Sequence, residues 1–225
     1  FTMMNHARLG VGLQGQGLSE LAFQAAVAYA NERIQGRSLT GPKNKDKPAD
    51  PIIVHPDVRR MLLTQKALVE GGRVLAFLTG REIDSAHMNP DADARKRSSD
   101  LVAFLTPVVK SFLSDAAVEV TSLGVQVHGG HGYIRETGVE QLMRDARIAP
   151  IYEGTNGIQA LDLLGRKVFG TQGKSQQMMV GRIKETIEKF GSIEAVAPMA
   201  TELARRLEQW NKLTLDLGMA AMKNP

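Results

Sequence analysis

The stretch 142–159 combines an acidic side chain with neighbours suited to chemistry. It reads Leu-Met-Arg-Asp-Ala-Arg-Ile-Ala-Pro-Ile-Tyr-Glu-Gly-Thr-Asn-Gly-Ile-Gln, and its carboxylate, Glu153, stands between an apolar-aromatic pair and a glycine. A helix should begin directly afterwards, because Thr155 or Asn156 can accept hydrogen bonds from the N–H groups of a first turn. A carboxylate in apolar surroundings beside a helix N-terminus is a candidate general base, because loss of water disfavours its charged form. A surface loop with a routine cap would show the same spacing.

Two other motifs suggest chemistry that their context does not support. The segment Gly10-Val-Gly-Leu-Gln-Gly15 fits the G-x-G-x-x-G pattern, but such a turn needs a strand before it, and Asn-His-Ala-Arg is no strand. We interpret these glycines as small residues that let helices pack closely. His128 and His131 lie in a glycine turn without further ligand-type residues at metal-site spacing, so we predict no metal.

The composition is that of a folded domain with a mild positive charge. The chain has 225 residues, 43% of them hydrophobic, no cysteine and a net charge of +4. The lack of cysteine excludes disulfides and thiol chemistry and is compatible with a cytoplasmic location. The charge alone does not indicate nucleic acid, and we expect neither a signal peptide nor a membrane span. Because the chain opens at Phe1 and not at methionine, we expect a piece of a longer protein.

Apolar periodicity predicts helices nearly throughout. The predicted helices cover residues 1–35, 56–85, 89–123, 139–146, 156–169, 176–190 and 193–217. The only strand candidate is 51–54, so the fold class is all-α, an antiparallel helical bundle with an added C-terminal helical hairpin. We place the domain boundary between 1–170 and 171–225.

Local details of three of these elements are also predicted. The buried stripe of the first helix is expected to be Leu9, Leu13, Leu21, Ala25, Ala28 and Tyr29. Asn89 and Pro90 are expected to open the third helix as its cap and first residue. The turn-rich segment 38–50 should be a loop whose lysines, Lys43, Lys45 and Lys47, are solvated, although they could touch a phosphate.

Four short motifs together resemble one family. Met143-Arg-Asp-Ala146, Ile151-Tyr-Glu-Gly-Thr155 and Ile158-Gln159 are similar to the catalytic segment of the acyl-CoA dehydrogenases, and Gln126-Val-His-Gly-Gly-His-Gly-Tyr133 resembles their glycine turn. The similarity runs from about Asn5 to Val168. The long loop at 38–50 and the extra C-terminal residues resemble an enlarged branch of the family, such as the methylmercaptopropionyl-CoA dehydrogenases.

The resemblance implies a flavoenzyme that removes hydrogen from both carbons next to an acyl-CoA thioester. Glu153 would take the α proton, and FAD would accept the hydride from the β carbon. The implied substrate-binding residues are Asn5, Arg8 and Gly154. The implied FAD-binding residues are Arg33, Gln126, Gly129, Gly130, Thr155, Asn156 and Gly157. Arg33 and Gln126 are expected to serve the FAD of a neighbouring subunit, which predicts a homo-oligomer.

Some points of the resemblance stay open. The family has Phe-Gly where this chain has Gly36-Arg37, which puts the usual aromatic contact at the flavin in doubt. Electron-transfer flavoprotein is the implied electron acceptor, but an acyl-CoA oxidase shares the same base and flavin and passes its electrons to oxygen. A DNA-associated family member with weak dehydrogenase activity and a non-catalytic helical module are further alternatives. Glu20, Glu136 and Glu140 are the other acidic residues that could act as the base.

Overall fold

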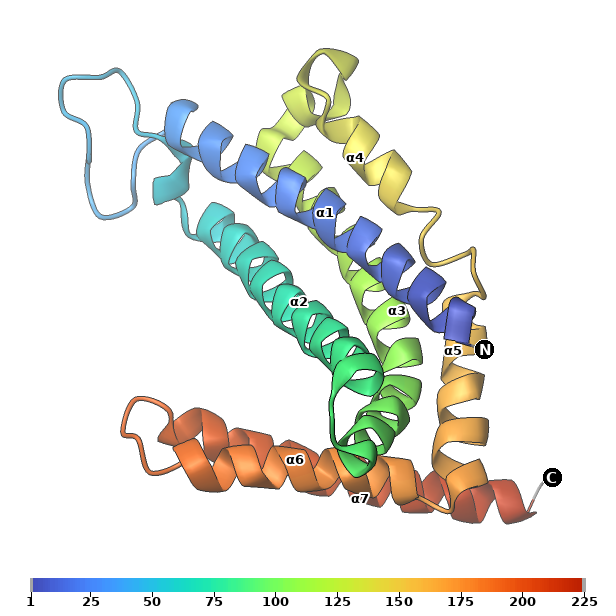
Figure 1. Ribbon diagram of the computed structural model, residues 1–225. Helices are drawn as coiled ribbons and strands as arrows, with labels where there is room; N and C mark the ends of the chain where they lie inside the picture. Colours follow the sequence, from blue (N-terminus) through green and yellow to red (C-terminus); the bar gives the residue numbers. More distant parts are fainter. Residues whose placement is uncertain (1, 224–225) are drawn as a thin grey trace. The chain divides into compact units, whose positions relative to one another are not determined.

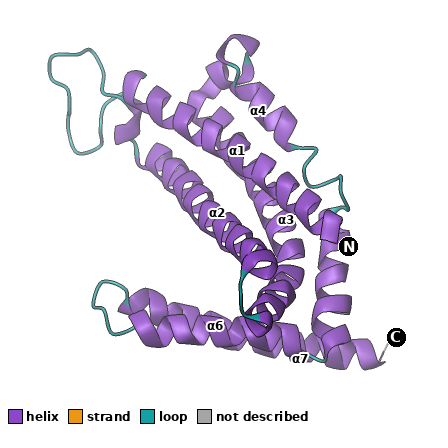
Figure 2. Ribbon diagram, in the orientation of Figure 1, coloured by secondary structure: helices purple, strands orange, loops and turns teal. Residues whose placement is uncertain are grey.

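The computed structural model describes residues 2–223, and within them it contains helices and loops but no strand (Figures 1 and 2). The predicted all-α class is therefore confirmed. The chain folds into two compact units, Phe1–Ala160 and Leu161–Pro225. This division falls ten residues before the predicted domain boundary.

Unit 1 is built around three long helices that lie side by side (Figure 1). Its elements are α1 (Thr2–Glu32), the 3-10 turn η1 (Ile52–Val54), α2 (Pro56–Met88), α3 (Ala92–His128), the 3-10 turns η2 (Gly129–Tyr133) and η3 (Arg135–Thr137), α4 (Val139–Ala146) and α5 (Asn156–Leu161). Helix α3 is the central element, because both α1 and α2 pack on it.

The buried face of α1 consists of small residues, which corrects the predicted stripe. Leu13 and Leu21 are 48% and 56% exposed. The buried hydrophobic side chains of α1 are Val11, Ala22, Ala26 and Ala30, and the polar side chains of Gln16 and Ser19 are buried on the same helix. A Cβ atom on Gly15 would lie 2.8 Å from the carbonyl oxygen of Leu113, so the backbones of α1 and α3 approach closely there. This close approach leaves no room for a larger side chain at position 15 of α1. The interpretation of these glycines as packing residues is confirmed for Gly12 and Gly15, whereas a Cβ atom on the exposed Gly10 would meet nothing within 4 Å.

The ends of two predicted elements differ in the structure. The N-cap of α3 is Asp91, not Asn89, and the Asp91 carboxylate accepts a hydrogen bond from the Asp93 N–H at 2.9 Å. The strand candidate at 51–54 is the turn η1 (Ile52–Val54), and Pro51 before it forms an isolated antiparallel bridge with Ile34. Backbone hydrogen bonds flank this bridge, from the Gln35 N–H to the Asp50 carbonyl (2.9 Å) and from the Ile52 N–H to the Arg33 carbonyl (2.8 Å), and the chain then turns into η1.

Helix α3 has the length and hydropathy of a membrane span, with a mean hydropathy of 1.5 over its most apolar window. This differs from the expectation that no apolar segment approaches that length. Within the described residues, 67% of the window is buried in the structure. Such burial is typical of the core helix of a bundle, and it accounts for the apolar composition without a membrane.

The loop between α1 and η1 is organised around a buried carboxylate. The side chain of Asp50 is fully buried and accepts backbone hydrogen bonds from Ser38 (2.9 Å), Lys43 (2.9 Å) and Asn44 (2.7 Å). Arg37 also pairs with it at 3.4 Å. These contacts, first the Ser38 and Asn44 N–H groups, lower the pKa of Asp50 from 3.8 to about 2.

We expect the Asp50→Asn variant to lose the ordered loop at neutral pH, because an amide supplies one uncharged acceptor where the carboxylate supplies two charged ones. In the unchanged protein, a lowered carboxyl pKa contributes stability that is complete above the ordinary value and is lost as the pH falls through about 2. Hydrogen exchange of the amides at 38–50, corrected for the intrinsic pH effect, should show both results. Asp46→Asn, at an exposed position of the same loop, is the control.

Unit 2 consists of a short irregular segment and a helical pair. Its elements are the π-helix η4 (Asp162–Val168), the 3-10 turn η5 (Phe169–Thr171), α6 (Lys174–Phe190) and α7 (Ala197–Lys223). The pair α6 and α7 is the predicted hairpin. The helix predicted over 156–169 is α-helical only to Leu161 and continues as η4.

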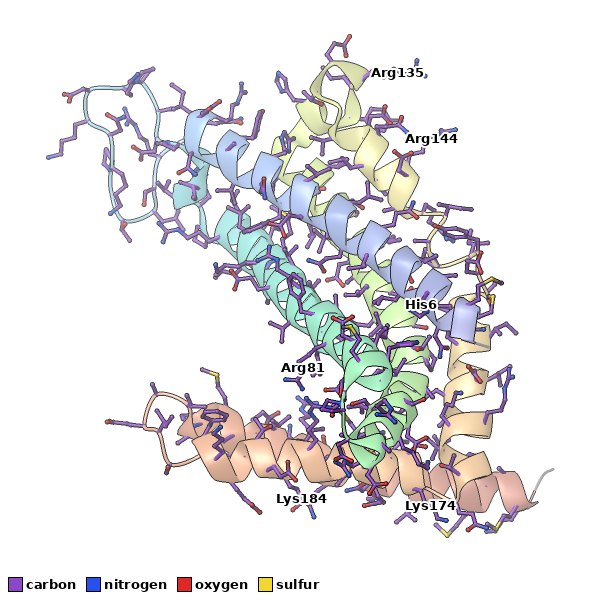
Figure 3. The ribbon with its side chains drawn as sticks, in the orientation of Figure 1. His6, Arg81, Arg135, Arg144, Lys174 and Lys184 are labelled. Carbon is purple, nitrogen blue, oxygen red and sulfur yellow. The ribbon has the colours of Figure 1, made fainter. Side chains whose placement is uncertain are left out.

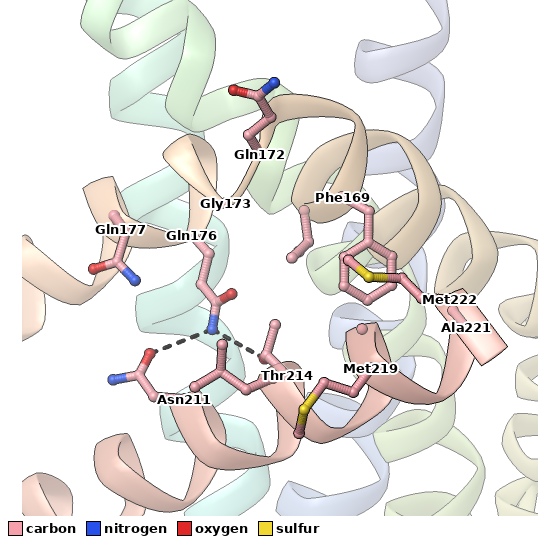
Figure 4. Close-up of a pocket in the computed structure, with 13 residues that line it drawn as sticks. Phe169, Gln172, Gly173, Gln176, Gln177, Asn211, Thr214, Met219, Ala221 and Met222 are labelled. Carbon is pink, nitrogen blue, oxygen red and sulfur yellow. Dashed lines mark hydrogen bonds between the residues drawn. The ribbon is translucent and has the colours of Figure 1, made fainter.

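A hollow of about 700 Å³ lies within unit 2 (Figure 4). Beside it, the buried Gln176 joins α6 to α7, donating to Asn211 (3.4 Å) and Thr214 (3.0 Å). The lining of the hollow is mostly apolar and includes Phe169 and Met219. The hollow contains none of the predicted site residues.

Candidate functional site

The loop that carries Glu153 is closed at its base. The Asn156 N–H donates to the Pro150 carbonyl at 3.0 Å, so the loop is a compact excursion between α4 and α5. At its tip, Glu153 and Gly154 both have positive φ angles, 54° and 85°. For glutamate this left-handed conformation costs on the order of 1–3 kcal/mol, and it persists only where the surroundings enforce it.

Glu153 is exposed in this chain, contrary to the predicted apolar surroundings. The neighbouring Ile151 and Ile158 are themselves 48% and 46% exposed, so they do not cover the carboxylate. The helix expected after the loop, α5, is also short, with six residues. The loop therefore presents Glu153 outward and does not bury it within unit 1.

Gln159 holds the tip of the loop from below. Its side chain is fully buried, and its Nε2 donates to the carbonyl oxygens of Glu153 (3.3 Å) and Gly154 (3.0 Å). A Cβ atom on Gly154 would lie 2.7 Å from this nitrogen, so position 154 requires glycine for both space and conformation. Gln159 appeared in the sequence only as part of the family motif, and its contacts could not be read from it.

The two predicted cap residues have different roles. Thr155 Oγ1 accepts a hydrogen bond from the Ile158 N–H at 3.4 Å, which is a long cap interaction. Asn156 instead turns its side chain toward α3, where it accepts from Lys110 Nζ (2.8 Å) and donates to Asp115 (2.7 Å). Lys110 was not predicted from the sequence.

The predicted substrate residues of α1 lie beside this loop. A Cβ atom on Gly154 would lie 3.9 Å from Nη2 of Arg8, which places the guanidinium against the loop tip. Asn5 lies one helical turn before Arg8 and thus on the same face of α1. Tyr152 fastens the loop to α1 as well, because its hydroxyl donates to the Gln14 side chain. The structure thus brings Glu153, Gly154 and the Arg8 face of α1 together.

The alternative acids are placed less favourably. Glu20 forms an ion pair with Arg73, and that hydrogen bond lowers the pKa of Glu20, which makes it a weaker base. Glu136 lies in η3 and is exposed. Glu140 lies in the first turn of α4 and lines a hollow whose lining does not include Glu153.

That other hollow, of about 580 Å³, lies beside α4 and is lined by exposed apolar side chains and arginines. The apolar members exposed by more than a third are Tyr133, Met143, Ile148 and Ile151. Figure 3 shows Arg135 and Arg144 projecting outward from this region. An apolar patch with a charged rim is typical of a surface that packs against another protein surface.

A second group of predicted residues gathers where α1 and α3 end. Arg33, Gln126, Gly129 and Gly130 all line one hollow of about 400 Å³. Gly129 has a φ angle of 59°, and a Cβ atom on either glycine would meet nothing within 4 Å, so the backbone there is open to a ligand. A guanidinium, a side-chain amide and open backbone N–H groups are donors suited to phosphate oxygens.

The histidines of this hollow make contacts inside the protein. The rings of Tyr29 and His128 stack with centroids 4.4 Å apart, and the Tyr29 hydroxyl lies 3.3 Å from Nδ1 of His131. His55, which the sequence did not single out, lies 2.8 Å from the Gln35 carbonyl through its Nε2 and lines the same hollow. Among residues 2–223 no group of three potential metal ligands gathers.

The two groups of site residues lie far apart in one chain. Arg8 and Arg33 stand near opposite ends of α1, which has 31 residues. A rise of 1.5 Å per residue puts them about 37 Å apart. The chain therefore carries two separate candidate half-sites, one around Glu153 and one around Arg33.

The fold and these two half-sites are accompanied by a family match over most of the chain. Residues 1–168 match the family model described as "Acyl-CoA dehydrogenase, C-terminal domain". The chain belongs to the acyl-CoA dehydrogenase family, as the motifs around Glu153 and Gly129 predicted.

Similar proteins include two named acyl-CoA dehydrogenases and one solved structure. The chain is 49% identical over 209 residues to a 3-methylmercaptopropionyl-CoA dehydrogenase of Ruegeria pomeroyi, covering 93% of this chain and 34% of that protein. It is 34% identical over 200 residues to a butyryl-CoA dehydrogenase of Syntrophomonas wolfei, covering 89% and 32%. The solved structure of Caenorhabditis elegans ACDH-11 in complex with C11-CoA shares the fold, with a TM-score of 0.83, 22% identity and coverage of 99% and 35%. The chain thus spans about a third of the length of these relatives.

Proposed function

We propose that this chain is the C-terminal helical domain of a cytoplasmic, FAD-dependent acyl-CoA dehydrogenase, with Glu153 as the base that removes the α proton. The observation that carries the proposal is the Glu153 loop. At its tip the backbone of Glu153 is strained, with a positive φ angle, and the side chain is exposed beside Arg8. Backbone strain that the surrounding contacts enforce is a common property of active sites.

The chain's own residues would divide the work at the acyl group. The Glu153 carboxylate takes the α proton, which leaves negative charge on the thioester oxygen. The Glu153 backbone N–H donates a hydrogen bond to that oxygen and so stabilises the charge. Gly154 lets the substrate approach the backbone because it has no side chain. Arg8 and Asn5 bind polar groups of the acyl-CoA.

The half-site around Arg33 fits the phosphates of FAD. It supplies a guanidinium, the Gln126 amide and the open backbone of Gly129 and Gly130, and no carboxylate lines the hollow. When bound, FAD would supply the acceptor for the β hydride. Thr155, the Asn156 backbone and Gly157 would contact it beside Glu153, since the Asn156 side chain is engaged with α3.

The distance between the half-sites supports an assembly of several copies. A span of about 37 Å along α1 exceeds the length of one dinucleotide, so a single FAD does not contact both groups of one chain. Each complete site would combine the Glu153 half-site of one subunit with the Arg33 half-site of its neighbour. The exposed apolar patch beside α4 is a further surface for packing in such a homo-oligomer.

The experiment for this proposal uses the full-length protein. We expect it to purify yellow, with FAD bound, and to lose its flavin colour when an acyl-CoA is added without oxygen. Electron-transfer flavoprotein should then restore the colour faster than oxygen does. The isolated domain should be inactive, because it lacks most of the pocket. A colourless protein, or one whose colour no acyl-CoA bleaches, would contradict the proposal, and faster recovery with oxygen would indicate an oxidase.

A further inference from the structure

Helix α3 contains a lysine at a position where charge is costly. The side chain of Lys110 is fully buried, and it heads the fully buried side chains when these are ranked by size. Burying an ammonium group costs several kcal/mol unless hydrogen bonds and opposite charges compensate for it. A buried lysine therefore needs hydrogen-bond acceptors or opposite charges that offset this cost.

The partner of Lys110 is the loop that carries Glu153. The Lys110 ammonium donates a hydrogen bond to Oδ1 of Asn156 at 2.8 Å. The same oxygen accepts from the Ser114 hydroxyl at 3.2 Å, and the Asn156 amide nitrogen donates to Asp115 (2.7 Å) and to the Ser111 carbonyl (3.3 Å). All hydrogen-bonding groups of this asparagine side chain are thus used, and they fix it to α3.

Asn156 is also the residue that closes the loop, through its backbone bond to Pro150. Its anchoring to α3 therefore fixes the base of the loop, while Gln159 fixes the tip at the Glu153 and Gly154 carbonyls. Neither contact involves the Glu153 carboxylate itself. The loop is held by its backbone and by Asn156, and the carboxylate stays available.

The charges around Lys110 include the Glu153 carboxylate. The pKa of Lys110 is lowered, first by burial and also by Arg8, while Asp115 and Glu153 act in the opposite direction and raise it. The Glu153 carboxylate is therefore within electrostatic range of the Lys110 ammonium.

We propose that Lys110 is a positioning residue for Glu153, which acts by anchoring the loop through Asn156. The proposal rests on the proposed function, because it assigns a purpose to the position of the Glu153 carboxylate. Lys110 touches neither substrate nor FAD in this scheme.

The test compares variants of the full-length protein. Lys110→Met keeps the length of the side chain and removes the charge, and replacement of a buried charge by an apolar group of similar volume is often tolerated. Asn156→Ala removes the loop's side of the contact, and the double variant completes a cycle. Lys96→Met is the control, since Lys96 lies exposed on the same helix and pairs with Asp100. The readouts are hydrogen exchange of the amides at 150–156, FAD content, and the rate and substrate affinity of single-turnover flavin bleaching.

Lys110→Met should speed exchange at 150–156 but not in α3, and it should slow bleaching at saturating acyl-CoA by about 10–100-fold. Substrate affinity and FAD content should stay within about threefold of the unchanged protein, and the Lys96 variant should match that protein throughout. The double variant should be no slower than Asn156→Ala alone, because without the asparagine Lys110 has nothing to hold.

Unchanged loop exchange and an unchanged bleaching rate in Lys110→Met would overturn the proposal, and so would losses that multiply in the double variant. If Lys110→Met does not fold, Asn156→Ala decides, since a rigid loop and a normal rate without the amide would equally contradict the anchoring. If the unchanged protein does not bleach, the proposed function fails, while the exchange at 150–156 still shows whether Lys110 orders the loop.

Discussion

Replacement of Glu153 by glutamine should lower kcat of the full-length enzyme by about 10²-fold or more, the range lost with a positioned base. Glutamine has nearly the same shape, but its amide cannot accept the α proton. The loop contacts should survive, because Gln159 and Asn156 hold the backbone and not the carboxylate. Steady-state kinetics, FAD content and helical circular dichroism of the purified variant measure these effects.

The control for this variant is Glu140→Gln, which removes a carboxylate from α4 that lines a different hollow. It should keep kcat within about twofold, as is usual for surface substitutions. An unchanged kcat with a raised KM in Glu153→Gln would indicate a binding role for this residue. A large loss in Glu140→Gln would move the base to α4.

Replacement of Arg33 by methionine should weaken FAD binding by about 10–100-fold, because a hydrogen bond to a charged group contributes about 1.5–3 kcal/mol. Arg33 is exposed and is one of the donors of its hollow, so its loss should leave the helices intact. Titration of the FAD-free protein with FAD gives the dissociation constant. Arg60→Met is the control, since Arg60 is exposed on α2 and pairs with Asp57.

The Arg33 variant also tests the arrangement of subunits. If one site uses Glu153 of one subunit and Arg33 of its neighbour, mixed oligomers of Arg33→Met and Glu153→Gln chains should contain some sites with both residues intact. At an FAD concentration too low to load the Arg33 variant, such mixtures should regain activity that neither variant has alone. A monomeric protein, or mixtures without any recovery, would contradict sites shared between subunits.

The sequence predicted the helices well because their signals are local. Apolar periodicity and turn residues act within a few positions, and the helix expected over 139–146 has those bounds in the structure. The prediction of the buried face of α1 was wrong because burial on this helix depends on its contact with α3. Leucine spacing favoured Leu13 and Leu21, whereas close helix contact selects glycine and alanine.

The candidate site divides in the same way. The family motifs predicted Glu153, Gly154 and the residues around Arg33 as site residues. The structure gathers these residues into two half-sites. Lys110 could not be found from the sequence, because its partner Asn156 lies 46 residues further along the chain. A lysine in an apolar helix usually lies at the surface, and only tertiary packing shows that this one is buried.

The most direct test of the central claim is single-turnover flavin bleaching with saturating acyl-CoA, without oxygen, in the full-length Glu153→Gln protein. This measurement isolates proton and hydride removal from later electron transfer and from product release. If Glu153 is the base, bleaching should slow by about 10²-fold or more while FAD and acyl-CoA remain bound. Bleaching at the rate of the unchanged protein would show that Glu153 is not the base.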